Sequence, residues 1–569
     1  SVVTRERATR IATEGDTRVT GLATGPLTAQ RLADLDGTWA PLEWTITHRG
    51  TYDTTQQRLA LESLALRFGR TRLEGRGVVD RVGPQARADL RIQGEDLDVA
   101  QLLSWASHAS GTPLQGVTGR GTLAFDVRVR GALEPGTRPE VVGTVRLRDG
   151  ALRAPQAPAE VSGLAFDAAL RPDSVRVTSL RAVVAGQPVT ASLVAWSFAD
   201  PRVAFALRGN LDLAVLAPLV APRDVKLSGR AVVDVQGHGR VADPSALVLT
   251  GEARLTNVRF ASPALPKPLE RIEGRVAFAE DVARIEGLSL RAGASSLALD
   301  GRVTHPLALM AAPSRTPPAE VTFELRSPEL DLADLQPTTP GAPFLPNARG
   351  EGRVRLARLV QQRLDVRDVQ ADVRLEPAVL EVPRFALAGY GGTVQGDARF
   401  DLRDTRRPGW TVHANVASVQ ADSLLAAWTP ARGLLAGTLD TRLTFAGEGR
   451  SRDDLEHTLT LVALSSIREG RLGPGPVLEA IATWTRVPRL RQVDFSRLDL
   501  PLRIEHGRVI TDPVVLNGAA GEWRLVGAVG FDGALDYAVS VTLPPAAIEA
   551  LAARSALAAG ALADPQGRL

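Results

Sequence analysis

The side chains most often used for catalysis or metal binding are scattered through this sequence. Its 569 residues include seven histidines and no cysteine. The histidines are His48, His108, His238, His305, His413, His457 and His506. None of them belongs to an HExxH motif or a close pair, so we expect surface or turn histidines rather than metal ligands. Without cysteine, the chain has neither disulfides nor thiolate-based metal sites.

Two glycine clusters have the composition of phosphate-binding loops. They are Gly389-Tyr390-Gly391-Gly392 and Gly447-Glu448-Gly449. A phosphate loop leads from a strand into a long helix, whereas each of these clusters lies between two strand-like segments. We therefore interpret both as hairpin turns. Because no GxSxG nucleophile motif is present either, we predict no enzymatic activity, no cofactor and no metal.

Arginine alternates with apolar residues in two segments, at Arg128 and Arg130 and again at Arg146 and Arg148. Such a row could bind phosphate head groups or an anionic membrane surface. Acidic residues are interspersed throughout, and the net charge is only +3. We therefore interpret the arginines as the solvated face of a sheet, where charge resists association. The same balance gives little support for a nucleic-acid partner, and we expect none.

The elements that would position any site are mostly strands. Leu123–Arg130, Val145–Arg148 and Val321–Arg326 alternate apolar and polar residues, and Gly, Pro and Asp punctuate the chain at intervals that suit turns. Successive side chains of a strand point to opposite faces, so the pattern predicts a sheet with one dry and one wet face. Val161–Leu219 illustrates the unit: three passes of strand with turns at 171–174 and at Gly186, then a short helix.

Two sequence markers repeat along the chain. The first is a Gly-rich strand–turn–strand pattern, seen as LRFGRTRLEGRGV (66–78), LRAGASSLALDGRV (290–303), LAGYGGTVQGDARF (387–400) and LNGAAGEWRLVGAV (516–529). The second, LDVAQLL, LDLAVLAPL and LDLADLQ, starts at Leu97, Leu211 and Leu330, which are 114 and 119 residues apart, and a looser copy starts at Val419. Its Asp predicts the N-cap of a short helix. Repeats of this length indicate a stacked, elongated protein.

Few segments have a helical pattern. We expect helices at Val99–Ala109, Leu213–Val220, Asp422–Trp428, Val477–Trp484 and Pro545–Ala559. No run of about 18 apolar residues occurs in the sequence, so we expect no membrane-spanning helix within it. The first residue is Ser1 and the only methionine is Met310. We therefore expect a processed chain or a fragment.

The alternating apolar face is the remaining candidate for a functional surface. It could be ordinary core, as in stacked sandwiches, or an open groove that holds acyl chains, and the pattern alone allows both. Its aromatic residues are sparse and few helices are available to cover it, which favours the groove. The candidate lining residues are Leu123, Phe125, Val127, Val129, Leu164, Phe166, Val203, Phe205, Leu207, Val276, Phe278, Val321, Phe323, Leu325, Phe400, Phe445 and Phe531.

A family resemblance becomes specific in the C-terminal part of the chain. Gly437–Phe445 is followed by GEGRS (447–451), REGRLG (468–473) and the stretch Val493–Pro544, which contains DFSRL, IEHG and LDY. In this order, over about 110 residues, the segments resemble the C-terminal region of the AsmA family of Gram-negative envelope proteins. The upstream repeats resemble the β-rich body of the same family, which includes AsmA itself and YhdP-like and TamB-like proteins.

The resemblance implies a mainly β fold: an elongated, repetitive antiparallel sheet curled into a U-shaped hydrophobic groove, with a few short helices. Residues 1–430 are then the repetitive groove body and 431–569 the AsmA-like C-terminal region. The resemblance also implies that the chain is truncated at both ends. The family carries no catalytic residues that could be transferred to this chain.

The implied function is a periplasmic bridge that conducts phospholipid between the inner and outer membranes. Its anchor would be an N-terminal inner-membrane helix outside this sequence, and membrane proteins at either end are possible partners. The alternative is a factor or scaffold for outer-membrane protein assembly that acts through exposed strand edges.

Overall fold

The fold is that of a computed structural model, which describes most of the chain. The described residues are 10–19, 44–68, 71–83, 85–103, 117–133, 137, 139–153, 161–220, 224–243, 247–263, 265–310, 317–336, 347–404, 406–428, 433–449, 451–473, 478–479, 482–483, 488–518, 521–532, 534–542 and 553.

The described residues form 28 strands of a largely antiparallel sheet and a few short helices, which confirms the predicted mainly β class. The chain divides into two units. Unit 1 comprises Ser1–Phe260 and Arg275–Val282, and unit 2 comprises Ala261–Gly274 and Ala283–Leu569. The predicted boundary at residue 430 is a separate hypothesis and stays a prediction.

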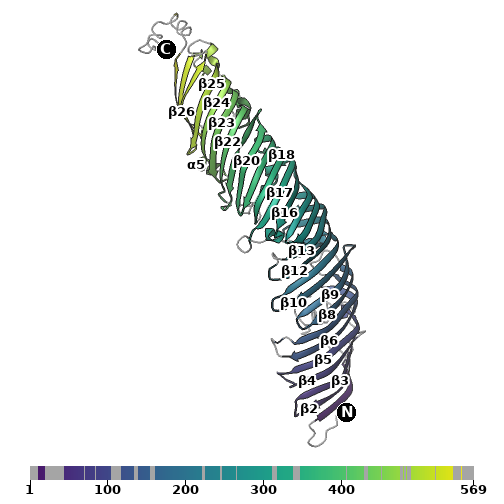
Figure 1. The fold of residues 1–569 in the computed structure, drawn as a ribbon. Helices are drawn as coiled ribbons and strands as arrows, with labels where there is room; N and C mark the ends of the chain where they lie inside the picture. Colours follow the sequence, from purple (N-terminus) through teal and green to yellow (C-terminus); the bar gives the residue numbers. More distant parts are fainter. Residues whose placement is uncertain are drawn as a thin grey trace, which may run out of the picture. The chain divides into compact units, whose positions relative to one another are not determined.

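Unit 1 is built from strands that pair with their neighbours in chain order, each antiparallel to the next from β1 to β12 (Figure 1). The strands are β1 (Arg10–Val19), β2 (Trp44–Asp53), β3 (Arg58–Phe68), β4 (Thr71–Asp80), β5 (Arg87–Asp98), β6 (Thr118–Ala132), β7 (Glu140–Arg153), β8 (Val161–Arg171), β9 (Ser174–Val184), β10 (Gln187–Trp196), β11 (Arg202–Asp212) and β12 (Lys226–Arg240). They are followed by β13 (Val248–Ala261), β14 (Leu269–Glu280) and β15 (Val282–Ala292), over which the chain passes between the units.

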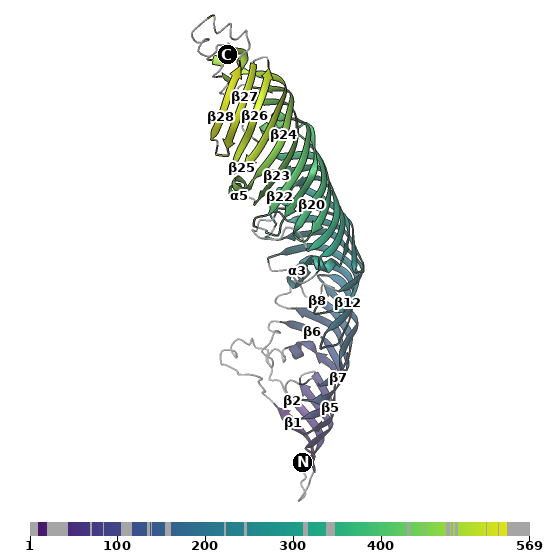
Figure 2. The same ribbon diagram turned by 60° about the vertical axis from the view of Figure 1, so that its left-hand side comes forward.

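Unit 2 repeats this arrangement from β16 to β28, with one exception (Figure 2). The exception is the pair β17–β18, which is parallel. The strands are β16 (Ser295–Thr304), β17 (Ala319–Asp331), β18 (Ala348–Gln361), β19 (Leu364–Glu376), β20 (Val379–Gly389), β21 (Gly392–Asp401), β22 (Gly409–Gln420), β23 (Leu435–Glu448), β24 (Thr460–Leu472), β25 (Val493–Glu505), β26 (Arg508–Gly518), β27 (Gly521–Gly530) and β28 (Leu535–Thr542).

Short helices follow the strands that carry the second sequence marker. Residues 99–103 are helical after β5, α3 (Leu213–Val220) follows β11, the 3₁₀ turn η3 (Leu332–Asp334) follows β17, and α4 (Ala421–Trp428) follows β22. Other short helices are η2 (Pro306–Met310), α5 (Arg452–Thr458) and η4 (Pro488–Arg491).

The predicted N-caps are confirmed at three of the four markers. The carboxylates of Asp98, Asp212 and Asp331 accept hydrogen bonds of 2.8, 2.9 and 2.9 Å from the backbone N–H two residues ahead. Asp422 instead lies in the first turn of α4 and accepts a 3.0 Å bond from the backbone N–H of Gly433, which ties down the chain after the helix.

Strand direction puts these helices at one edge of the sheet in each unit. In unit 1, β5 and β11 are six antiparallel steps apart, so both end at the same edge. In unit 2, β17 and β22 are five steps apart, and five antiparallel steps would place their ends at opposite edges. The one parallel pair, β17–β18, restores the direction, so both strands end at the same edge. We call this the helix edge of each unit, and the other the turn edge.

The repeat unit seen in the sequence has one more strand than predicted. Val161–Leu219 forms β8, β9, β10 and β11 before α3, since Gln187–Trp196 pairs with β9 on one side and β11 on the other. The helices predicted at Leu213–Val220 and Asp422–Trp428 are confirmed, and that at Val99–Ala109 is seen over residues 99–103. Residues 478–479 and 482–483 of the predicted Val477–Trp484 helix are helical, whereas Pro545–Ala559 lies outside the described helices and strands.

Candidate functional site

Strand pairing in unit 1 aligns apolar side chains into rows that cross the sheet. Residues directly opposite each other on paired strands lie on the same face. One such row runs from β5 to β12 without a polar residue. Its members are Gly94, Phe125, Val145, Ala168, Val177, Leu193, Phe205 and Gly237. We call the face that carries this row the apolar face of unit 1.

Unit 2 has an apolar face of the same construction. Its longest apolar row crosses ten strands, from β16 to β25. The row consists of Leu299, Leu325, Val354, Ala371, Phe385, Gly396, Ala414, Leu443, Ala463 and Leu502. The parallel pair does not interrupt it, because Leu325 of β17 lies opposite Val354 of β18.

The opposite face of unit 1 is held by ion pairs between neighbouring strands. Arg91 on β5 donates to Asp126 on β6 over 2.8 Å, and Arg128 on β6 donates back to Asp89 on β5 over 2.6 Å. Hydrogen bonding from Arg128 lowers the pKa of Asp89 to about 2, and hydrogen bonding from Arg91 lowers the pKa of Asp126 to about 2.

The second arginine segment follows the same rule, since Arg146 donates to Asp167 over 2.5 Å. All these side chains are exposed, so each pair stabilises the fold only slightly. The predicted solvated face is therefore confirmed at Arg128, Arg130 and Arg146, all of which pair with aspartates.

The predicted lining residues lie on strands, except Phe531, which follows β27 in a turn. Leu164 is buried and the other sixteen are half-buried. In unit 1 the apolar face brings together the candidates of β6, β8 and β11, and in unit 2 it brings together those of β17, β21 and β23. Val276 and Phe278 share one face of β14. That these residues line a lipid groove stays a prediction.

Sequence reasoning missed a recurring pair on these faces. Four aromatic rings each lie over a glycine directly opposite on the neighbouring strand: Phe205 over Gly237, Phe323 over Gly352, Trp410 over Gly447 and Phe495 over Gly470. A Cβ on Gly352 would come within 2.3 Å of the Phe323 ring. The ring therefore lies flat against the sheet and covers exposed backbone. The signal was present as glycines inside strand patterns, of which we interpreted only Gly447, as part of a hairpin turn.

The apolar face is closed along the helix edge. In unit 1, Leu147, Leu164 and Ala182 form a buried cluster, and Val99 of the helical residues 99–103 packs on it. In unit 2, a second cluster contains Leu330, Leu356, Val366 and Val369, with Leu332 and Leu335 at η3 packed against it. All of these strand residues lie toward the helix edge, so the helices cover that margin and leave the middle of the strands half-exposed.

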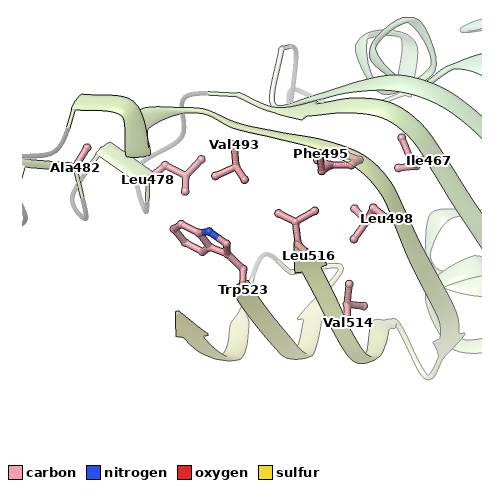
Figure 3. Close-up of a cluster of buried hydrophobic side chains, with 9 residues drawn as sticks. All are labelled: Ile467, Leu478, Ala482, Val493, Phe495, Leu498, Val514, Leu516 and Trp523. Carbon is pink, nitrogen blue, oxygen red and sulfur yellow. The ribbon is translucent and has the colours of Figure 1, made fainter. Parts of the chain in front are cut away.

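A larger buried cluster occupies the helix edge near the C-terminal strands of unit 2. It contains Ile467, Leu478, Ala482, Val493, Phe495, Leu498, Val514, Leu516 and Trp523. Side chains of β25 face those of β26 and β27 across it, and Leu478 and Ala482 close one side (Figure 3). Val493 is 0% and Trp523 2% exposed, so this part of the apolar face is true core.

On the described residues, polar side chains form helix caps and ion pairs between strands. No group of three or more His, Asp or Glu side chains with metal-binding geometry is found among them, and His108 lies outside them. His413 contacts Asp397 at 2.8 Å on the charged face of unit 2, as a hydrogen-bond partner. No helix within the described segments has the length and apolar character needed to cross a membrane.

Comparison with known proteins identifies one region. Residues 347–514 match the AsmA family, so the chain carries an AsmA family domain there. This domain extends from β18 to β26 and includes part of the large buried cluster. The predicted resemblance is thus confirmed over this range. No curated protein and no solved structure matches the chain.

Proposed function

We propose that this protein conducts phospholipids between the inner and outer membranes along a groove formed by its apolar face, without enzymatic activity. The AsmA family domain supports an envelope location, because the family resemblance is to Gram-negative envelope proteins. In this proposal the chain lies in the periplasm and is anchored to the inner membrane by a helix outside this sequence. The sheet curls around its apolar face to form the groove.

The observation that carries the proposal is the half-exposed apolar row. A soluble sheet normally covers such a face with a second layer, because exposed apolar area is unfavourable in water. Among the residues that the structure describes, helices cover only the helix edge, and Phe125, Phe205 and Phe323 stay half-buried. Acyl chains would complete the missing layer.

A row that crosses many strands also explains movement along it. Each methylene group kept from water contributes about 0.8 kcal/mol, so a lipid gains by staying on the face. Neighbouring strands spaced by about 4.8 Å present similar side chains, so the lipid can shift between near-equivalent positions. The charged outer face, with its Arg–Asp pairs, stays in water.

Photo-crosslinking in cells tests this proposal directly. A photoreactive amino acid is placed at Phe125, Phe205, Phe323 or Phe445, and crosslinked phospholipid is measured by mass spectrometry. Matched controls at Arg128 and Arg148 carry the same group on the opposite face. We expect lipid adducts at the four phenylalanine positions and background levels at the controls. Adducts confined to the arginine positions would exclude the groove.

A second candidate function is an envelope scaffold that binds a protein partner. The observation that favours it is on β24, where Val462 and Leu464 are 55% and 67% exposed on the charged face, opposite Arg503 and Arg442. The variant Leu464→Ser separates the two functions. It leaves lipid adducts unchanged if the protein conducts lipid through the apolar face, and it abolishes partner capture if β24 is a docking surface.

A further inference from the structure

The two edges of the apolar face differ in a way that orients a bound lipid. At the helix edge of unit 1, Leu97 is fully buried and Leu147 and Leu164 are buried under Val99 and its neighbours. Thr71 is buried there as well and donates a 3.0 Å hydrogen bond to Gln101 of the helical residues. Protein side chains therefore occupy this margin, which disfavours a polar head group there.

The turn edge of unit 1 is open and amphipathic. Four large apolar side chains stand exposed directly after strands that end there: Val82, Leu133, Phe198 and Val241, at 43%, 47%, 39% and 50% exposure. Exposed ion pairs lie at the same edge, between Arg240 and Asp200 at 3.0 Å and between Arg58 and Asp80 at 3.5 Å. Apolar side chains beside paired charges match the boundary between the acyl chains and the head group of a lipid.

These apolar side chains are held in place by hydrogen bonds between successive turns. The backbone N–H groups of Val82, Leu133 and Val241 donate to the carbonyls of Gln57, Ala86 and Pro201 at 3.0, 2.8 and 2.8 Å. Phe198 is fixed by a 2.8 Å bond from its N–H to Asp173. The turn edge is therefore a rim of hydrogen-bonded turns that carries apolar side chains just beyond the strand ends.

The uncovered width suits one acyl layer. On β6 the half-buried stretch from Phe125 to Gly131 is roughly 20 Å long at about 3.4 Å per residue. One leaflet of a bilayer contributes about 15 Å of hydrocarbon. A diacyl lipid that lies along the strands can thus place its chain ends near the helix edge and its glycerol at the turn edge.

We infer that unit 1 binds phospholipid in one orientation, with the acyl ends toward the helix edge and the head group over the turn edge. This inference rests on the proposed function and adds to it a direction across the groove. In this orientation the glycerol backbone of the lipid lies beside Val82, Leu133, Phe198 and Val241.

The absence of cysteine allows a clean test. Single cysteines replace Val203, Phe205 or Leu207 on β11, or Val129, Val127 or Phe125 on β6. The full chain is mixed with phosphatidylcholine vesicles that contain a trace of lipid with a maleimide head group. A second preparation carries a photoreactive group at the acyl terminus. The rate at which each cysteine reacts with soluble maleimide without lipid corrects for its accessibility. Arg128→Cys, on the opposite face, gives the background yield of adducts.

The orientation predicts opposite trends along the two antiparallel strands. Head-group adducts should fall about fivefold or more from Val203→Cys to Leu207→Cys and from Val129→Cys to Phe125→Cys, since apolar burial excludes the polar maleimide. Acyl-terminus adducts should rise in the same directions. Val203 and Val127 lie in one cross-strand row, as do Phe205 and Phe125, so the paired positions should give equal yields.

Two results overturn the inference, and they are distinguishable. A uniform yield along each strand, or a reversed trend, excludes the orientation but leaves lipid binding intact. Adducts no higher than those of Arg128→Cys at every position, with both probes, exclude lipid binding by this face and therefore the proposed function as well.

Discussion

The middle of the apolar face in unit 1 and the large cluster at the C-terminal strands of unit 2 use the same local design. Each places an aromatic ring over a glycine on the next strand, Phe205 over Gly237 in one and Phe495 over Gly470 in the other. Yet Phe205 is half-buried, whereas Phe495 is 5% exposed. The difference comes from the second layer: side chains of β26 and β27, with Leu478 and Ala482, cover Phe495. Among the described residues, no helix or sheet layer covers Phe205 in that way.

The comparison shows that alternation alone does not separate core from a half-exposed apolar face. The apolar rows have the same composition in both regions, and only closure by another layer converts a dry face into core. An apolar face that the described residues leave half-exposed is consistent with the proposed function, because the acyl chains of a lipid can cover it. Variants that remove the same kind of side chain should therefore have different consequences in the two regions.

The largest expected effect is loss of stability on truncation in the closed region. Trp523→Ala should reduce the free energy of unfolding of unit 2 by about 3–5 kcal/mol, because it leaves a cavity in a fully packed cluster. Phe205→Ala should cost only roughly 1–2 kcal/mol, because the ring is half in water already. Urea unfolding followed by hydrogen exchange in β26–β27 and in β11 measures both. Equal losses at the two positions would contradict the distinction between core and open face.

A charge in the open region should act on lipid rather than on folding. Phe323→Asp should reduce lipid adducts at Phe445, in the same unit, about tenfold or more, because moving an acyl chain past an ionised carboxylate removes water from the charge. Stability should fall by roughly 1–2 kcal/mol, since the side chain keeps access to water. Phe323→Leu is the matched control and should retain both properties. Normal lipid transport in Phe323→Asp would argue against a continuous apolar path.

Much of this fold was accessible from the sequence, and the limits have physical causes. Alternation identified the strands of Val161–Leu219 and the wet and dry faces, and the Asp markers identified the helix positions at Leu97, Leu211 and Leu330. The sequence could not reveal the parallel pair β17–β18, because the local pattern is the same for either direction. It also could not separate Phe495 from Phe205, because closure depends on how β26 and β27 fold over β25, and the alternation along each strand does not encode that.

Helix caps should have a moderate effect that is confined to the helix edge. Asp331→Ala removes the carboxylate that accepts from the N–H of Ala333 at 2.9 Å, and a lost N-cap typically costs about 1 kcal/mol. We expect faster hydrogen exchange at η3 and in the adjoining ends of β17 and β18, with β22–β23 unchanged. Asp331→Asn is the control, because asparagine also caps. Increased exchange spread evenly over unit 2 would show that η3 does not act as a local cover.

The smallest expected effect is electrostatic and lies on the face away from the proposed groove. Arg128 lowers the pKa of Asp89 to about 2 in the folded chain, below its usual value near 3.8. The ionised form is therefore the one that stabilises the fold, fully above pH 4 and progressively less as the pH falls toward 2. The melting temperature of Asp89→Asn should lie slightly below that of the unmodified chain at pH 6, and the gap should close by pH 2. When both proteins also carry Arg128→Gln, their melting temperatures should nearly coincide at every pH, because Arg128 is the main partner of Asp89. A gap that widens on acidification would mean that Asp89 acts through its protonated form, and a change in lipid adducts in either variant would show that the two faces are coupled.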